Sequence, residues 1–340
     1  MLKVSHLGID IGGAHLKVIG VDKRNKVIFV DYISCAIWEG IEKLQAKIRN
    51  INNIINNNSV KCGITMSGEM CDNFKNRLIG AKILIKECNK LRFNNFFYVS
   101  SKEVFTKKPN YKHLISLNWH SIGRFLENKI ENCIAIDFGS TTTDFICIKN
   151  NKIINKFTDD YSRINNTELL YTGFTRTPIF GVTNQIDYNK KKLKIIPEFF
   201  SNTSDIYRIL GRLDKKIDLD DTADKSKKNI TQSLIRLSRS FGFDYKSKNL
   251  KKLKVISQKI SSIQLNQIFQ ITLELQKKFL LKNQPVIISG IGQDVLYNYL
   301  KKNKLKTFYF KQFLNKSRLN KEASFHAPAV SIALLLQRLK

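Results

Sequence analysis

Two segments of the chain, 8–21 and 135–148, align with each other without gaps. In each segment an apolar run ends in Asp-x-Gly, and a short turn leads into a second apolar run. This pattern is typical of a β-hairpin with a tight turn. Asp10 aligns with Asp137, and the glycine two positions later is shared as well. A repeated unit of this kind favours a fold made of two related halves.

The residues around each hairpin predict an α/β unit. After the first hairpin, 27–34 has the pattern of a third strand, the spacing of apolar residues over 37–55 predicts a helix, and 61–66 predicts another strand. The second hairpin is followed by a predicted strand at 152–157. Late in the chain, 285–290 is an apolar strand that enters a glycine turn and a helix. We therefore expect an α/β protein with two lobes and a central cleft.

The same reading divides the chain into domains. We predict a first α/β lobe over 1–130 and a second over 131–326, the latter with a less regular, substrate-side insertion at about 165–245. The apolar helix predicted at 327–338 contains small residues suited to close packing, and we expect it to pack back on the first lobe. These bounds place the two Asp-x-Gly corners on different lobes.

Further helices are expected in and after the insertion. Apolar residues recur at helical spacing over 205–213, 230–241 and 256–281. The lysine-rich stretch 246–254 predicts a loop or a solvated face.

The net charge of +30, from 58 Lys+Arg against 28 Asp+Glu, raises the question of a nucleic-acid partner. Most of the basic residues are lysines, whereas base recognition favours arginine. They are also scattered along the whole chain rather than gathered in one stripe. We therefore attribute most of the charge to general composition and do not expect a nucleic-acid partner.

Membrane association is not expected either. There is no run of about 18 uncharged apolar residues, which is the minimum for a spanning helix. The first residues lack the long apolar stretch of a signal peptide. We predict a cytoplasmic protein.

A strand that ends in Asp and turns through glycine brings a carboxylate and several backbone N–H groups to one point. Glycine lets a ligand approach closely, and the N–H groups can hold phosphate oxygens. A carboxylate there can anchor Mg²⁺, which bridges to the phosphate. In the alternative interpretation, the glycines only shape turns and the aspartates cap them. The matched pair of corners, with the later Ser-Gly-Ile-Gly at 289–292, favours a clamp for a di- or triphosphate.

These features resemble the actin/Hsp70/sugar-kinase superfamily, whose lobes are ribonuclease H-like repeats with two phosphate motifs and a late glycine motif near the nucleotide. The sequence has no GxxxxGK[ST] or GxGxxG motif, so other common phosphate-binding folds are not expected. The late motif supplies Gly290 and Gly292 as candidate cofactor contacts.

Less generic segments resemble one family within that superfamily. Met66-Ser-Gly-Glu-Met70, Tyr171-Thr-Gly-Phe-Thr-Arg-Thr-Pro178 and Ala327-Pro-Ala-Val330 lie in the order expected of the hydantoinase A/oxoprolinase-like proteins linked to tetrahydromethanopterin-dependent one-carbon transfer. The resemblance covers almost the whole chain. It implies a transferase of methanofuran or methylofuran biosynthesis that joins an aminomethylfuran-methyl diphosphate to a tyramine-type phenol, forming an ether and releasing diphosphate.

That reaction assigns roles to the motif residues. We predict that Asp10 and Asp137 organise Mg²⁺, and that Glu69 is a general base or a helix cap. Arg176 is a candidate carboxylate or phosphate clamp, or else a structural ion pair. The residues predicted to hold phosphate oxygens or to add positive charge are Gly12, Gly13, Lys17, Gly139, Ser140, Thr141 and Thr142. Asp224 and Lys225 could line the substrate lobe or form a surface pair.

One residue departs from the family pattern: His15 follows Gly-Gly-Ala where relatives usually have Asn. A histidine at this position can still donate a hydrogen bond. The predicted partners are a small diphosphate and a phenolic amine, and the chain could form homo-oligomers. Three alternatives remain open: an ATP-dependent kinase or amidohydrolase of the oxoprolinase type, a basic nucleic-acid-binding protein, and an actin-like nucleotide sensor without chemistry.

Overall fold

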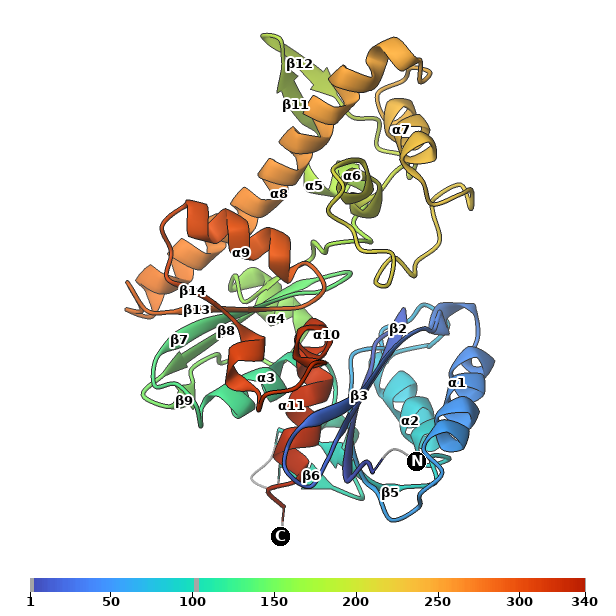
Figure 1. The fold of residues 1–340 in the computed structure, drawn as a ribbon, viewed down its shortest axis with the longest axis vertical. Coiled ribbons are helices and arrows are strands. Elements are labelled where there is room, and N and C mark those ends of the chain that lie inside the picture. Colours follow the sequence, from blue (N-terminus) through green and yellow to red (C-terminus); the bar gives the residue numbers. More distant parts are fainter. Residues whose placement is uncertain (1–2, 101–103, 340) are drawn as a thin grey trace.

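The computed structural model describes residues 3–100 and 104–339. Two mixed β-sheets form the frame of two lobes, and a helical insertion rises from one of them (Figure 1). The strands of the first sheet are β1 (His6–Ile11), β2 (His15–Val21), β3 (Val27–Ser34), β4 (Lys61–Met66), β5 (Asn94–Tyr98) and β6 (Phe105–Thr106). Those of the second are β7 (Cys133–Phe138), β8 (Thr143–Lys149), β9 (Lys152–Ile153), β10 (Leu169–Leu170), β13 (Val286–Ser289) and β14 (Thr307–Tyr309).

The two sheets share one topology. The first has the order β3-β2-β1-β4-β5-β6, with β1–β2 and β2–β3 antiparallel and β1–β4–β5 parallel. The second has the order β10-β8-β7-β13-β14, with β7–β8 antiparallel and β7–β13–β14 parallel. The shared topology confirms the internal repeat and the predicted α/β fold with two lobes.

The hairpins have the same register, so the two halves present equivalent positions at their ends. Asp10 lies opposite Lys17 in the first hairpin, and Asp137 lies opposite Asp144 in the second. The two positions opposite the motif aspartates thus carry opposite charges, and this difference determines how each corner of the cleft is neutralised.

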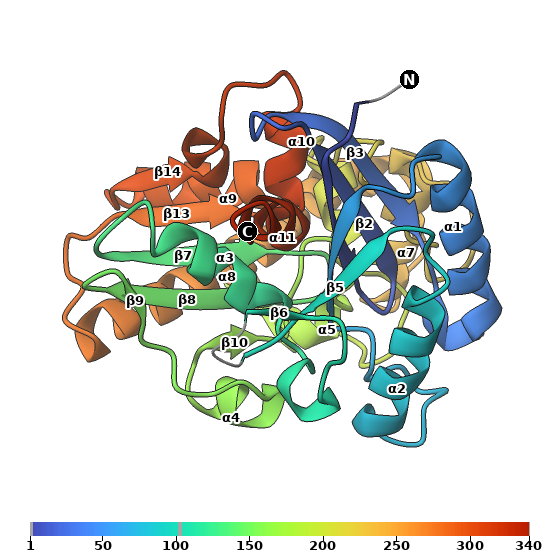
Figure 2. The same ribbon diagram turned by 90° about the horizontal axis from the view of Figure 1, so that it is seen from below.

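Most of the α-helices pack on these sheets or connect them. They are α1 (Ile41–Ile54), α2 (Arg77–Cys88), α3 (Asn118–Leu126), α4 (Asp160–Asn165), α9 (Gln293–Lys302), α10 (Asn320–Phe325) and α11 (Ala327–Leu336), with short 3-10 turns at Ile37–Glu39, Tyr111–His113, Ser247–Asn249 and Phe310–Phe313. The C-terminal helix α11 packs against β1, β2, β4 and α3, and Figure 2 shows it end-on between the two sheets. The approach is close: a Cβ on Gly8 would lie 1.9 Å from the Ala329 carbonyl oxygen, so glycine is required there.

The insertion is a separate helical unit above the second sheet (Figure 1). It contains α5 (Ile179–Val182), the hairpin of β11 (Gln185–Tyr188) and β12 (Lys191–Lys194), α6 (Thr203–Ile209), α7 (Ile230–Arg239) and part of the long α8 (Leu250–Lys278). Its own apolar core joins α5, α6, α7 and α8. Because α8 also reaches the second sheet, it connects the insertion to that lobe.

Several sequence expectations need correction. The helix predicted over 37–55 is a 3-10 turn followed, after Gly40, by α1, and only Lys152–Ile153 of the strand predicted at 152–157 is paired. Of the two alternatives for 246–254, the loop is wrong from Leu250 onward, where α8 begins, whereas the exposed Lys251 and Lys254 agree with a solvated face. Lysine has good helix propensity, and Leu253 and Ile256 are buried at helical spacing, so the helix extends through the lysine-rich stretch. None of the helices in the described parts of the chain is long and apolar enough to cross a membrane.

Candidate functional site

A cavity of about 410 Å³ lies where the two hairpin turns approach each other. It brings together ten of the residues selected from the sequence, contributed by both lobes: Asp10, Gly12, Gly13, Lys17, Asp137, Gly139, Ser140, Thr141, Thr142 and Arg176. Three other candidates, Glu69, Gly290 and Gly292, are not among its lining residues. The predicted juxtaposition of the two Asp-x-Gly corners is therefore present in the structure.

The first corner is an ion pair inside the cavity. Lys17 Nζ lies 2.9 Å from Asp10 Oδ2, as the cross-strand register requires. The Asp10 side chain is buried, and its Oδ1 has no hydrogen-bond partner in the described part of the chain. A buried carboxylate oxygen without a partner is costly. This oxygen is therefore available to a cation or donor that enters the cavity.

The second corner is built differently. The Ser289 hydroxyl, from β13, donates a 2.6 Å hydrogen bond to Asp137 Oδ1. Burial raises the pKa of Asp137 to about 7, and the nearby charges of Asp144 and Asp10 act in the same direction, against the Ser289 bond and Lys17. A bound cation would favour the charged form. Ser289 was named in the sequence only as part of the glycine motif; its role as the partner of Asp137 follows from the β7–β13 register.

Asp144, which the sequence did not mark as functional, also lines the cavity. Arg163 Nη1 donates a 2.7 Å hydrogen bond to its Oδ1, and Nη2 donates to the Glu168 carbonyl. The Arg163 guanidinium lies over the Trp119 ring at 3.9 Å. The second corner thus has two acids where the first has one acid and one lysine, and a buried arginine supplies the balancing charge.

Only some of the turn N–H groups are free. Those of Gly12 and Gly139 close the hairpins, donating to the carbonyls of His15 and Thr142 at 3.0 Å. They are therefore not available to phosphate, contrary to the simplest form of the prediction. The N–H groups of Gly13, Ser140 and Thr141 donate to no protein group in residues 3–100 and 104–339. The N–H of Thr142 likewise has no acceptor among these residues, so these four are backbone donors that can hold an anion.

Glu69 lies behind the cavity wall rather than in it. The Ser116 hydroxyl, which does line the cavity, donates a 2.7 Å hydrogen bond to Glu69 Oε1, while Oε2 has no partner in the described structure. Burial raises the pKa of Glu69 above its ordinary value, and the Ser116 bond only partly opposes this. The N-cap of α2 is Asn76, so the helix-cap alternative for Glu69 is wrong.

This burial predicts a pH dependence of stability. A carboxyl whose pKa is raised in the folded state stabilises the fold fully below its unfolded pKa of about 4.3, and this contribution is lost as pH rises through the folded value. We expect Glu69→Gln, which keeps an acceptor for Ser116, to flatten the fall in unfolding free energy above pH 4.5. Urea titrations of both proteins at several pH values would measure it; parallel pH profiles would contradict it.

Arg176 lies over the Trp38 ring at 4.6 Å, and its Nε is 3.8 Å from Asp220 Oδ1. The same Asp220 oxygen lies 3.2 Å from His15 Nε2. Burial is the main cause that lowers the pKa of His15, so its ring is neutral near pH 7. The ion-pair alternative for Arg176 is thus present as a loose contact, and the residue also lines the cavity.

The late glycines serve packing. A Cβ on Gly290 would lie 2.4 Å from the Phe138 carbonyl oxygen, and one on Gly292 would lie 2.3 Å from the Phe138 ring. Ile291 between them lines the cavity. Asp224 forms an ion pair with Arg236 at 3.0 Å in the insertion, and neither it nor Lys225 lines the cavity.

The donor set suits a divalent cation that keeps several waters. Mg²⁺ is commonly held by one or two carboxylates and the phosphate it accompanies. Asp10, with its unpartnered buried oxygen, and Asp137 are such carboxylates. In the described residues no group of three or more acidic, His or Cys side chains could hold an ion by itself. The site therefore fits a metal that arrives with its phosphate ligand.

Fold and cavity together define a two-lobed α/β protein whose two hairpin turns line one cavity. The family model described as "Hydantoinase/oxoprolinase" matches residues 120–299, and the chain belongs to this family.

Two curated relatives carry one activity name. The chain is 28% identical over 346 residues, 99% of each chain, to the "(4-{4-[2-(gamma-L-glutamylamino)ethyl]phenoxymethyl}furan-2-yl)methanamine synthase" of Methanocaldococcus jannaschii. It is 31% identical over 211 residues to the protein of the same name from Methanococcus vannielii, covering 62% of this chain and 93% of that one. Among solved structures, a ROK family glucokinase from Streptomyces griseus aligns with a TM-score of 0.49 and 11% identity, covering 97% of this chain and 98% of the glucokinase.

Proposed function

We propose that this protein is the transferase that forms the ether of the methanofuran core. It would join an aminomethylfuran-methyl diphosphate to the phenol of a tyramine-type acceptor and release diphosphate. The observation that carries the proposal is the alignment over 99% of the chain with a synthase whose named product contains a phenoxymethyl-furan ether. The cleft supports it, because it offers anion donors and carboxylates at one point.

In this reaction one C–O bond breaks and another forms. The bond between the furfuryl carbon and the diphosphate oxygen breaks, its electron pair leaves with diphosphate, and the phenol oxygen bonds to the carbon as its proton departs. The free N–H groups of Gly13, Ser140 and Thr141 suit the charge that develops on the leaving diphosphate. Lys17 and Arg176 add positive charge at the same cavity.

Mg²⁺ is part of the proposal. Asp10 and Asp137 would hold it, and when bound it would neutralise charge on the diphosphate. Its hard-cation chemistry matches two carboxylates and phosphate oxygens.

The acceptor would lie in the same cavity, against aromatic side chains. Trp119, Tyr171 and Phe325 line it and can pack on a phenol or furan ring. Asp160 lies nearby with its pKa raised mainly by burial, so it is a better proton acceptor than an ordinary aspartate. Arg77 Nη2 lies 3.5 Å from Asp160 Oδ2, and its charge partly opposes the rise in the pKa of Asp160. We assign Asp160, rather than the enclosed Glu69, as the group that takes the phenol proton.

The test is an incubation of the purified protein with the furan diphosphate and either γ-glutamyltyramine or tyramine, with and without Mg²⁺ and without ATP. We expect diphosphate release and an ether product that depend on the phenol and the metal. ATP consumption without ether formation would instead support a hydantoinase or oxoprolinase type of activity, which the family assignment keeps as the second candidate.

A further inference from the structure

Asp220 occupies a position between the lobes that links both phosphate hairpins. Its Oδ1 lies 3.2 Å from His15 Nε2, at the start of β2 in the first hairpin, which is a close polar contact although this nitrogen makes no hydrogen bond in the described residues. Its Oδ2 accepts a 3.1 Å hydrogen bond from the Thr175 hydroxyl. The backbone N–H groups of Thr175 and Arg176 in turn donate to the Ser140 carbonyl, in the turn of the second hairpin. One carboxylate therefore connects the two anion-binding turns.

The loop that carries Asp220 is held on both sides. On one side Arg208 donates two hydrogen bonds to Asp218 Oδ2, from Nε at 3.1 Å and from Nη2 at 2.7 Å. On the other side Arg236 Nη1 donates to Asp224 at 3.0 Å and to Ser226 at 2.8 Å. The Lys228 ammonium also donates to the Asp218 carbonyl at 2.8 Å.

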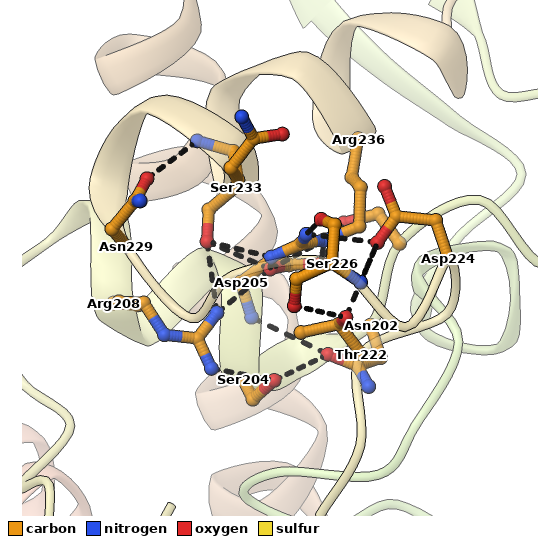
Figure 3. A network of polar contacts seen from close by, with 12 residues as sticks. Asn202, Ser204, Asp205, Arg208, Thr222, Asp224, Ser226, Asn229, Ser233 and Arg236 are labelled. Carbon is orange, nitrogen blue, oxygen red and sulfur yellow. Dashed lines mark hydrogen bonds and ion pairs between the residues drawn. The ribbon is translucent and has the colours of Figure 1, made fainter.

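Both arginines share a buried anchor. Asp205 accepts hydrogen bonds from Arg208 Nη1 at 2.8 Å and from Arg236 Nη2 at 2.6 Å. Asp205 and Arg236 are almost fully buried. Figure 3 shows the side chains of this network converging on Asp205. Buried ion pairs contribute little net stability but fix geometry, so the network is suited to holding the loop in one position.

We propose that Asp220 is a positioning residue for the diphosphate site. Held by the network around Asp205, it sets the spacing between the two hairpin turns through His15 and Thr175, and it orients Arg176 with its guanidinium face on Trp38. The proposal rests on the proposed function only in taking a diphosphate as the ligand. A misplacement of about 1 Å at such a site can cost about 100-fold in rate.

The probe for this role is inorganic diphosphate, whose binding in the presence of Mg²⁺ can be measured by calorimetry. We expect Asp220→Ala to weaken this binding by about 10- to 100-fold and to lower kcat/KM for the furan diphosphate by about 100-fold. Asp220→Asn keeps one acceptor oxygen for either His15 or Thr175, so we expect its kcat/KM to be about 10-fold higher than that of Asp220→Ala. The matched control is Asp221→Ala, because the neighbouring Asp221 is exposed and outside the cavity.

Unchanged diphosphate binding in Asp220→Ala, or an equal loss in Asp221→Ala, would overturn the proposal. If Asp220→Ala does not fold, Asp220→Asn against Asp221→Ala decides the same question. Asp218→Asn, which weakens the remote anchor without touching the cavity, should reproduce part of the loss. Binding of inorganic diphosphate does not require ether formation. If the proposed function is wrong, the ether is not formed, whereas if the positioning role is wrong, Asp220→Ala binds diphosphate as tightly as the unchanged protein.

Discussion

Asp10→Asn should reduce diphosphate release by about 100- to 1,000-fold, because a metal-held charge on a leaving diphosphate contributes several kcal/mol. The amide keeps the size of the side chain and one acceptor oxygen but loses the charge that would hold Mg²⁺. Asp10 is buried and its Oδ1 has no partner in the described structure, so this oxygen is open to a cation that enters the cavity. Release would be measured with a coupled diphosphate assay at saturating furan substrate and across a Mg²⁺ titration.

The control is again the exposed acid Asp221, whose change to Asn should leave the rate within about threefold. We expect Asp137→Asn to act in the same direction as Asp10→Asn, since the two corners face one cavity. A fully active Asp10→Asn protein with unchanged Mg²⁺ dependence would show that the metal lies elsewhere. Loss of the substrate's binding alone, with kcat retained, would assign Asp10 to binding rather than to the leaving group.

The hairpins were predictable because their signal is local. An apolar run ending in Asp-x-Gly defines both the strand and its turn, and the alignment of Asp10 with Asp137 predicted the shared topology of the sheets. The strand register then placed Lys17 opposite Asp10. The elements missed between residues 70 and 132, such as α2 and α3, have mixed composition and depend on packing against the sheets.

The remainder of the site depends on long-range contacts. Asp220 meets His15 across about 200 positions of sequence, and no motif surrounds it. Arg163 reaches Asp144 from α4, a helix of six residues that gives little periodic signal. Asp144 could have been found, since it aligns with Lys17 in the repeat and a charge reversal at matched positions requires a counter-charge. Registers within a hairpin follow from sequence, whereas contacts between lobes require the fold.

The net charge of +30 is not reflected in the residues that line the cavity, which are not predominantly basic. Asp10, Asp137, Asp144 and Asp160 all line it, together with few cations. Of those cations, Lys17 is paired with Asp10 and Arg163 with Asp144. The charges that line the cavity therefore nearly cancel, and a bound divalent cation would make the cavity more favourable for an anionic substrate. The surface lysines can only attract that substrate at long range.

Asp205→Ala is expected to have the largest effect on stability. Asp205 is the shared acceptor of two buried arginines, and it also accepts from the Ser201 and Ser233 hydroxyls. Removing one partner of a buried ion pair costs about 3–5 kcal/mol, because the remaining charge stays buried without compensation. Arg208 retains Asp218 and Arg236 retains Asp224, so we expect a value within this range rather than above it.

Urea unfolding followed by circular dichroism would measure the change, with m-values compared to detect separate unfolding of the insertion. The matched control is Asp187→Ala at the exposed position of β11, whose unfolding free energy we expect to stay within about 0.5 kcal/mol of the unchanged protein. Asp205→Asn preserves the shape and one acceptor oxygen, so its loss of unfolding free energy should lie between those of Asp205→Ala and Asp187→Ala. If Asp205→Ala is as stable as the control, the arginines must be able to reach water, and the network could not hold the Asp220 loop in place. A loss of stability confined to the insertion, accompanied by weaker diphosphate binding, would instead link this buried network directly to the cleft.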